Sequence, residues 1–379
     1  MGKKAVSKLF YCTSIALTFV LAGITIAGAF AGHIPPEHST LMPFIGLALS
    51  GLLLINLAVA IYWGIRRRFW IIIPLIAIAA NWQYLGRIFQ PPFTAGGKEA
   101  NTLKIATYNV DSFGNEQSGY SCKEIAAYMK EHRVDIICFQ EFAGNRYFTP
   151  DSIRNAFADW QYAIIPQAPD STPILQVALF SKYPVKDSRL ITYPDSRNCS
   201  MWCDLDVNGQ TVRVFNNHLQ TTEVSQNKRR LERELAKNEL TGREEAVARQ
   251  LLEGLNENFR KRAAQAKTLE QLIRTTPYPI LVCGDFNSLP SSYTYSTVKG
   301  DNLQDGFQTC GHGYMYTFRY FKRLLRIDYI FHSKEFKGVD YVGVNLAVSF
   351  SCIVGCPICK IYLVDHGYRN FKEKIHFME

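Results

Sequence analysis

The chain has 379 residues, which is more than one ordinary domain and predicts two units. Hydrophobic residues make up 47% and charged residues 20% of it, which excludes a mainly disordered protein. The formal net charge is +9, but the first 100 residues hold eight basic and only two acidic side chains. The rest of the chain is therefore nearly neutral, which gives little support to a basic face that binds nucleic acid tightly.

Three uncharged apolar runs fill most of the N-terminal quarter. They lie at roughly 9–31, 41–65 and 69–86. A helix needs about 20 apolar residues to cross a bilayer, and the first two runs exceed that length. The third run is shorter, but Trp82, Tyr84 and Arg87 give it an end typical of a membrane interface. The runs predict about three transmembrane helices; the alternatives are a cleaved signal peptide for the first and a buried or re-entrant segment for the third.

The positions of the basic residues predict the orientation of these helices. Three lysines precede the first run, and three consecutive arginines at 66–68 separate the second run from the third. The loop at 33–40 contains no Lys or Arg. The positive-inside rule then places the N-terminus in the cytoplasm and everything after Arg87 outside it. This predicts a multi-pass protein of the cell (inner) membrane, with a membrane module at 1–89, a linker at 90–101 and a soluble domain at 102–379.

The soluble part mixes strand and helix patterns. The expected strands lie at 103–109, 134–140, 175–181, 201–207, 211–218, 279–283 and 326–331. The segment 121–124 (SCKE) has the form of a capping box that opens a helix ending near His132. The segment 223–275 is rich in helix-forming charged residues, and we expect Gly242 to divide it into two helices. Its charges fit a solvated face or, alternatively, an arm that binds a partner.

Polar side chains gather at the ends of the expected strands. They are Asn109 and Asp111, Glu141, His218, Asp285 and Asn287, Asp328, and the pair Asp365 and His366. Alone, each has a structural explanation, because an Asn or Asp after a strand is usually a turn residue. Together they supply hard oxygen ligands and imidazoles, which are the groups that metal-assisted hydrolysis of a phosphoester requires.

Five segments, in this order, resemble the motifs of the endonuclease/exonuclease/phosphatase superfamily. They are 103–110 (LKIATYNV), 135–141 (DIICFQE), 217–219 (NHL), 284–287 (GDFN) and 326–331 (RIDYIF). The resemblance covers roughly 103–340 and identifies 102–379 as a catalytic domain. It implies an α/β fold, a four-layer sandwich of two packed mixed sheets flanked by helices, here preceded by an all-α transmembrane module. It also implies Mg²⁺ as the cofactor, with Mn²⁺ as a possible substitute.

The resemblance implies a metal site on the first two motifs. Glu141 would be the main Mg²⁺ ligand, with Asn109 at or near the metal. Asp365 is a further candidate ligand from the C-terminal tail. Asp111 matches an acidic position that some nuclease members of the family carry.

The remaining motifs would act on the substrate. Asp285 would orient or activate the attacking water, and Asn287 would bind the phosphate. His218 would hydrogen-bond the scissile phosphate or protonate the leaving oxygen. Asp328 would orient a second histidine, for which His366 is the candidate.

The C-terminal tail departs from the family pattern. The expected ending is Ser-Asp-His, but Val364 replaces the serine, and the similarity fades after Asp340. Either the tail has diverged and Asp365 and His366 still complete the site, or this dipeptide occurs by chance. A zinc site at three nearby cysteines, at 352, 356 and 359, is conceivable but lacks a clear fourth ligand.

The sequence therefore predicts a membrane-anchored, Mg²⁺-dependent hydrolase of phosphoesters, above all phosphodiesters, whose catalytic domain lies outside the cytoplasm. The substrate is a nucleic acid, a phospholipid head group or a small phosphodiester, and the N-terminal helices contact the lipid bilayer. The alternative is an inactive member of the fold that acts as a membrane-bound scaffold through the charged helices at 223–275. No protein partner follows from the sequence.

Overall fold

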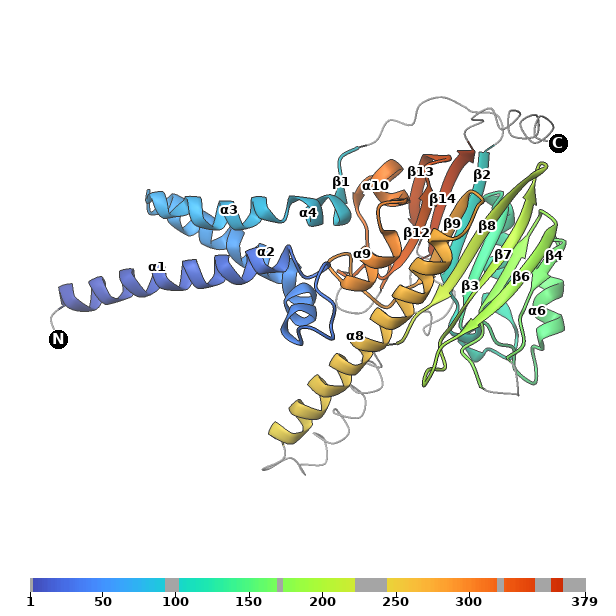
Figure 1. Ribbon diagram of the computed structural model, residues 1–379, viewed down its shortest axis with the longest axis horizontal. Coiled ribbons are helices and arrows are strands. Elements are labelled where there is room, and N and C mark those ends of the chain that lie inside the picture. The colour runs from blue at the N-terminus through green and yellow to red at the C-terminus, as the bar shows by residue number, and fades with distance from the viewer. Residues whose placement is uncertain are drawn as a thin grey trace, which may run out of the picture. The chain divides into compact units, whose positions relative to one another are not determined.

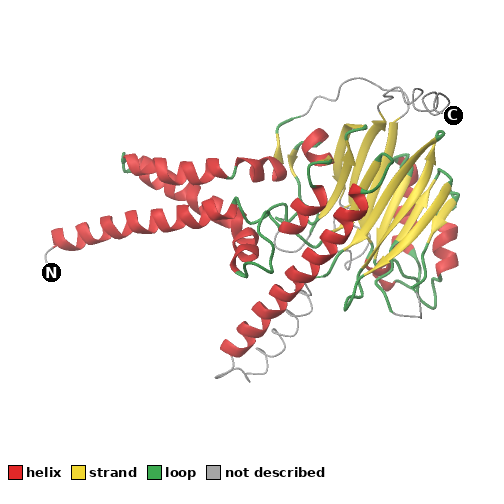
Figure 2. Cartoon of the chain, in the orientation of Figure 1, coloured by secondary structure: helices red, strands yellow, loops and turns green. Residues whose placement is uncertain are grey.

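The computed structural model describes residues 3–92, 102–168, 173–221, 244–318, 324–344 and 356–363. The chain divides into two compact units, which we call the helical unit and the sheet unit. The helical unit comprises Met1–Ile88, Gln220–Glu270 and Asn287–Val298. The sheet unit comprises Phe89–Leu219, Gln271–Phe286 and Lys299–Glu379. Figures 1 and 2 show the elements of each unit, with the strands gathered in the second.

The helical unit contains the apolar runs of the sequence. Its elements are α1 (Lys3–Gly28), α2 (Leu41–Ile65), the 3-10 helix η1 (Phe69–Ile71), α3 (Ile72–Ala80), α4 (Trp82–Ile88), and most of α8 (Glu244–Arg274) and α9 (Tyr293–Lys299). Within α1, the segment Val6–Gly28 is long and apolar enough to cross a membrane, and so is α2. The third run is bent by 59° between α3 and α4, so it is a broken span or a re-entrant loop.

Polar side chains connect the apolar helices to one another. Asn56 Nδ2 donates a hydrogen bond to Thr25 Oγ1 over 2.7 Å, and Trp63 Nε1 donates one to Thr18 Oγ1 over 2.9 Å. Asn81 Nδ2 donates to the Thr25 carbonyl over 2.9 Å. In apolar surroundings such bonds contribute about 0.6 kcal/mol each on average, and they fix which helix faces meet.

Two six-stranded sheets form the sheet unit. The first has the order β13 (Phe336–Val344), β14 (Cys356–Leu363), β2 (Thr102–Asn109), β3 (Ile136–Gln140), β5 (Ala178–Ser181) and β4 (Tyr162–Ile164). The second has the order β10 (Leu303–Asp305), β12 (Asp328–Ser333), β9 (Ile280–Asp285), β8 (Gln210–His218), β7 (Cys199–Val207) and β6 (Val185–Thr192). The remaining elements are β1 (Phe89–Gln90), β11 (Gly313–Tyr314), η2 (Asp111–Asn115), α5 (Tyr120–Glu131), α6 (Pro150–Ala156) and α10 (Gly306–Cys310).

Hydrophobic side chains pack on both faces of the first sheet. One cluster joins it to the second sheet, for example through Ile105 on β2 and Val214 on β8. Another joins it to the helices α5 and α6, through residues such as Met129 and Ile153. The predicted α/β sandwich, two mixed sheets flanked by helices and preceded by a helical region, is thereby confirmed.

Each sheet contains one parallel pair, and these pairs bring strand ends together. Strands β2 and β3 run parallel with Asn109 opposite Gln140, and β8 and β9 run parallel with His218 opposite Asp285. Gly284 has a φ of 137°, and a Cβ there would lie 1.9 Å from the Asn217 carbonyl oxygen. Only glycine therefore lets β9 approach β8 closely at this point.

The predicted capping box is wrong. Helix α5 begins at Tyr120 with Gly119 as its N-cap, so Ser121 lies inside the first turn. The Glu116 carboxylate accepts hydrogen bonds from the Ser121 backbone N–H, over 2.8 Å, and from its hydroxyl, over 2.5 Å. The carboxylate of Glu116 thus accepts a backbone N–H of the first turn, a role that the sequence had assigned to a capping box at Ser121. The predicted end near His132 is confirmed.

The described part of the charged segment predicted at 223–275 is helical, as predicted. Helix α8 occupies Glu244–Arg274, and Gly254 lies within it without a break. The predicted division at Gly242 falls outside the described residues.

Candidate active site

One amide group joins two carboxylates that come from different sheets. Asn109, the last residue of β2, donates hydrogen bonds through Nδ2 to Glu141 Oε1 over 3.0 Å and to Asp285 Oδ2 over 3.1 Å. Its Oδ1 accepts a hydrogen bond from the Asp111 backbone N–H over 3.1 Å. Glu141 and Asp285, which the sequence placed in separate motifs, therefore both lie within hydrogen-bond distance of Asn109.

Glu141 follows β3 directly and adopts a strained backbone conformation. Its φ is 49°, in the left-handed region that residues other than glycine rarely occupy. Asp111 and Asn287 have φ values of 42° and 48°. Such conformations cost about 1–3 kcal/mol and are concentrated at functional sites. The Glu141 side chain is 25% exposed, so ions and ligands from solvent can reach it.

His218 ends β8 with a side chain that is fully shielded from solvent. Its Nε2 lies 3.6 Å from Glu141 Oε1, which is too long for a normal hydrogen bond. Neither ring nitrogen has a hydrogen-bond partner among the described residues. Buried polar groups are normally hydrogen-bonded, so this imidazole is available to a group that the described chain does not supply.

Asp328 begins β12 directly opposite Asp285. It is fully buried, and neither carboxylate oxygen has a hydrogen-bond partner within the described residues. Burial and the negative charge of Asp285 raise the pKa of the Asp328 carboxyl well above its usual value. The nearby Thr317 side chain and the positive charge of Arg326 lower this pKa, but by less. A carboxyl group in this setting needs either a proton or a cationic partner.

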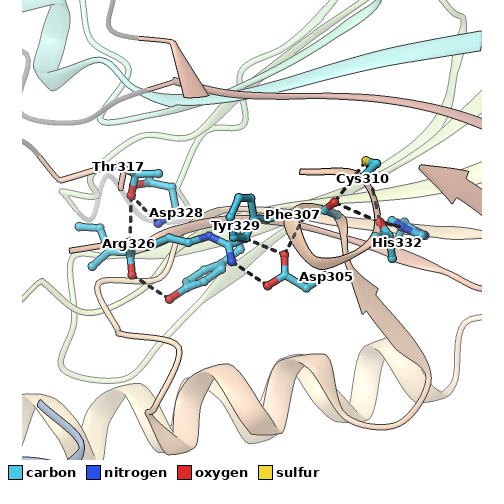
Figure 3. A network of polar contacts seen from close by, with 11 residues as sticks. Asp305, Phe307, Cys310, Thr317, Arg326, Asp328, Tyr329 and His332 are labelled. Atoms are coloured by element: carbon cyan, nitrogen blue, oxygen red, sulfur yellow. Dashed lines mark hydrogen bonds and ion pairs between the residues drawn. The ribbon is translucent and has the colours of Figure 1, made fainter. Parts of the chain in front are cut away.

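A buried ion pair holds the chain that leads into Asp328 (Figure 3). Arg326 donates through Nη1 to Asp305 Oδ2 over 2.8 Å and through Nη2 to Asp305 Oδ1 over 2.6 Å. The guanidinium also lies 4.7 Å from the ring centre of Tyr329 and 4.9 Å from that of Phe307. Asp305 is also the N-cap of α10, because its Oδ1 accepts a hydrogen bond from the Phe307 backbone N–H. The pair therefore fixes β12 to β10 and α10.

A polar link that the sequence analysis missed lies between the two sheets. Gln140 Nε2 donates to Asn216 Oδ1 over 2.6 Å and to Thr107 Oγ1 over 2.9 Å. Asn216 Nδ2 donates to the carbonyl groups of Phe139 and Ala178 over 3.0 and 2.9 Å. The signal in the sequence was the occurrence of an amide side chain inside each of two apolar strands. The link ties β3 to β8 just before Glu141 and His218.

The donors around Asn109 suit a hard divalent cation with few protein ligands. Within the described ranges, no group of three or more His, Cys, Asp or Glu side chains has an arrangement that could hold a metal. Mg²⁺ is usually held by one or two carboxylates and keeps several waters. Glu141, which is more exposed than Asp285, and the amide of Asn109 fit that requirement.

The cysteines of β14 do not form the conceivable zinc site. Cys356 packs in the cluster beside α5 and α6, whereas Cys359 packs between the two sheets. Side chains three positions apart on a strand point to opposite faces, so these two thiols cannot share a metal. Cys352 lies outside the described residues.

The structure brings together five of the residues that the sequence singled out. They are Asn109, Glu141, His218, Asp285 and Asp328. Asn287 follows Asp285 by two positions, and Asp111 follows Asn109 by two. Asp365 and His366 lie outside the described residues.

A family model described as Endonuclease/Exonuclease/phosphatase family matches residues 106–351. The chain belongs to this family. A second model, described as a domain of unknown function (DUF8431), matches residues 7–88. None of the curated proteins matches the sequence.

Several solved structures are similar to the chain. An endonuclease/exonuclease/phosphatase family protein from Bacteroides thetaiotaomicron shares 16% identity over 70% of this chain and 98% of its own, with a TM-score of 0.49. A Bacteroides vulgatus protein of the same description shares 17% identity over 70% and 100%, with a TM-score of 0.48. TDP2 from D. rerio, in a complex with a single-strand DNA product, shares 13% identity over 69% and 99%, with a TM-score of 0.47.

The buried ion pair gives a first prediction. Asp305→Asn leaves the Arg326 charge buried and unpaired, so we expect it to lower the free energy of unfolding by about 3–5 kcal/mol. Asp159→Asn removes one partner of an exposed ion pair with Lys130 and should change little. Thermal melting of both full-length variants checks this. Equal melting temperatures would show that the Arg326–Asp305 pair does not hold β12.

Proposed function

We propose that this protein is a Mg²⁺-dependent hydrolase of phosphodiester bonds. The observation that carries the proposal is the amide of Asn109, which hydrogen-bonds Glu141 and Asp285 while His218 lies beside Glu141. Family membership supports a phosphoric ester hydrolase at the coarse level. Nucleic acids, phospholipid head groups and small phosphodiesters all remain candidate substrates.

Glu141 and Asn109 would hold the metal, with Asp365 as a further candidate ligand. When bound, Mg²⁺ would neutralise the phosphate charge and polarise the phosphoryl oxygen. Asn109 also keeps Glu141 and Asp285 at a fixed separation, because its Nδ2 bonds both. That restraint limits the movement of two like charges that would otherwise repel each other.

The other residues would act on water and on the leaving group. Asp285 is buried and held by Asn109, so its carboxylate is positioned to orient an attacking water. His218 has two ring nitrogens without partners among the described residues, so one can donate a proton to the leaving oxygen. The Asn287 amide can donate a hydrogen bond to the phosphate without adding negative charge beside it.

Glu141→Gln tests the metal assignment. The substitution keeps the shape of the side chain and removes its charge, so hydrolysis of a phosphodiester should fall by about 10²-fold or more, with little change in melting temperature. Glu131→Gln, at the end of α5, is the control and should hydrolyse at the parent rate. The measurement is the initial rate of the full-length proteins at saturating Mg²⁺. A parent rate in Glu141→Gln would mean that the metal lies elsewhere.

His366→Ala tests whether the tail completes the site. Asp328 is buried without a hydrogen-bond partner among the described residues, and an imidazole is the partner that this chemistry uses. We therefore expect the variant to lose nearly all turnover while its Mg²⁺ dependence stays close to that of the parent. His376→Ala changes the same tail and should keep parent activity. Near-parent turnover in His366→Ala would show that Asp328 pairs with another group.

We further propose that the N-terminal helices anchor the protein in the cell membrane with the catalytic domain outside the cytoplasm. Lysines at 3, 4 and 8 lie at the start of α1 and the arginines at 66–68 follow α2, whereas the loop at 33–40 carries no Lys or Arg. The positive-inside rule assigns the basic ends to the cytoplasm, which supports a position outside it for the chain that follows a third span.

A reporter that is active only outside the cytoplasm tests this orientation. Fused after Gly97, it should be active, because three spans would carry that position across the membrane. Fused after Arg68, it should be inactive and serves as the control. Inactivity at Gly97, with activity of a cytoplasmic reporter there, would contradict the proposal and would mean that the bent α3–α4 pair does not span.

A further inference from the structure

The chain that begins at the candidate phosphate-binding residue packs with the N-terminal helices. Asn287–Val298 belongs to the helical unit together with Met1–Ile88. The segment follows the Asp285 motif directly and leads into α9. The loop that begins at Asn287 therefore packs within the helical unit.

Two hydrogen bonds tie this loop to the helices. Arg87, at the end of α4, donates through Nη1 to the Pro290 carbonyl over 2.8 Å. Ser291 Oγ donates to the Gly46 carbonyl on α2 over 2.8 Å. The Arg87 guanidinium also lies 4.9 Å from the ring centre of Tyr295, which is fully buried.

Glycines allow this close approach. A Cβ at Gly32 would lie 2.5 Å from Ser296 Oγ, and one at Gly46 would lie 3.1 Å from the Ala31 Cβ and 3.4 Å from the Ser291 carbonyl oxygen. Real Cβ atoms do not come as close as the first distance, so a side chain at Gly32 would force the Ser296 hydroxyl to move. The carbonyl oxygens of Ser291 and Ser292 would lie 3.4 Å from the same Cβ, so the loop packs closely against this position.

The loop also sets the direction of the Asn287 side chain. The φ of Asn287 is 48°, a left-handed turn conformation that asparagine tolerates better than most other residues with a side chain. Three residues separate Asn287 from Ser291, so fixing Pro290 and Ser291 restricts where the Asn287 amide can point.

We propose that Arg87 is a positioning residue that fixes the loop carrying Asn287. The inference rests on the proposed function, because it assumes that Asn287 binds the phosphate. Arg87 acts through the loop: its guanidinium holds the Pro290 carbonyl and stacks on Tyr295, and the loop presents Asn287. A planar guanidinium can make both contacts at once, which an ammonium group cannot.

A double-mutant cycle on the full-length protein in nanodiscs tests the proposal. The substrate is bis(4-nitrophenyl) phosphate with Mg²⁺. Loss of an oxyanion donor typically costs about 10²–10³-fold in kcat, which we expect for Asn287→Ala. Arg87→Gln should lower kcat by roughly tenfold or more, but by less than Asn287→Ala does. The kcat of Arg87→Lys should lie between those of Arg87→Gln and the parent. The Mg²⁺ dependence should not change.

The double variant distinguishes positioning from general stability. If Arg87 acts through Asn287, adding Arg87→Gln to Asn287→Ala should reduce kcat little further. Multiplying effects would overturn the proposal, and so would a parent rate in Arg87→Gln. Arg66→Gln, at the other end of α2 from Gly46, is the matched control and should retain parent activity.

Hydrogen–deuterium exchange gives a readout that does not depend on activity. In Arg87→Gln, amides at 287–298 should exchange faster, while those of β2 and β3 keep the parent rate. Unchanged exchange at 287–298 would also overturn the proposal. If the parent hydrolyses no phosphodiester, the proposed function fails, whereas the exchange experiment still decides whether Arg87 holds the loop.

Discussion

The side-chain amide of Asn109 is the group on which the candidate site depends, because it bonds carboxylates carried by the two different sheets. The fold makes this possible through one parallel strand pair in each sheet, which delivers Asn109 and Glu141 from one and His218 and Asp285 from the other to neighbouring strand ends. The Gln140–Asn216 link fixes the sheets to each other immediately beneath the site. Asn216 on β8 adds a second polar contact to β3, because its Nδ2 donates to the Phe139 carbonyl.

The same region breaks several local rules of stable structure. Glu141 and Asn287 adopt left-handed conformations, and Asp328 and His218 bury polar atoms without partners among the described residues. Sites that bind ions and substrates commonly keep such features, because the ligand supplies the missing interactions. The Arg326–Asp305 ion pair offers a contrast, since each of its charges has an oppositely charged partner and its role is to hold β12.

The sequence predicted the strand ends well, because apolar runs followed by Asn109, Glu141 or Asp285 are local signals. It failed at the start of α5, where the Glu116 carboxylate five positions upstream binds the backbone N–H of Ser121. It also failed at β14 in the apolar tail, a strand whose partners β2 and β13 leave no mark in its own sequence. The inclusion of Asn287–Val298 in the helical unit could not be predicted either. That packing depends on glycines and a single arginine far away in the chain, which leave no periodic pattern.

Metal removal is the most direct test of the central claim, that Asn109 assembles carboxylates from two sheets into one magnesium-dependent site. The full-length protein would be stripped with a chelator, and its rate of phosphodiester hydrolysis would be measured as Mg²⁺ is added back. The account predicts no hydrolysis without metal and a saturable return of the full rate with Mg²⁺. Hydrolysis at the same rate in excess chelator would contradict it.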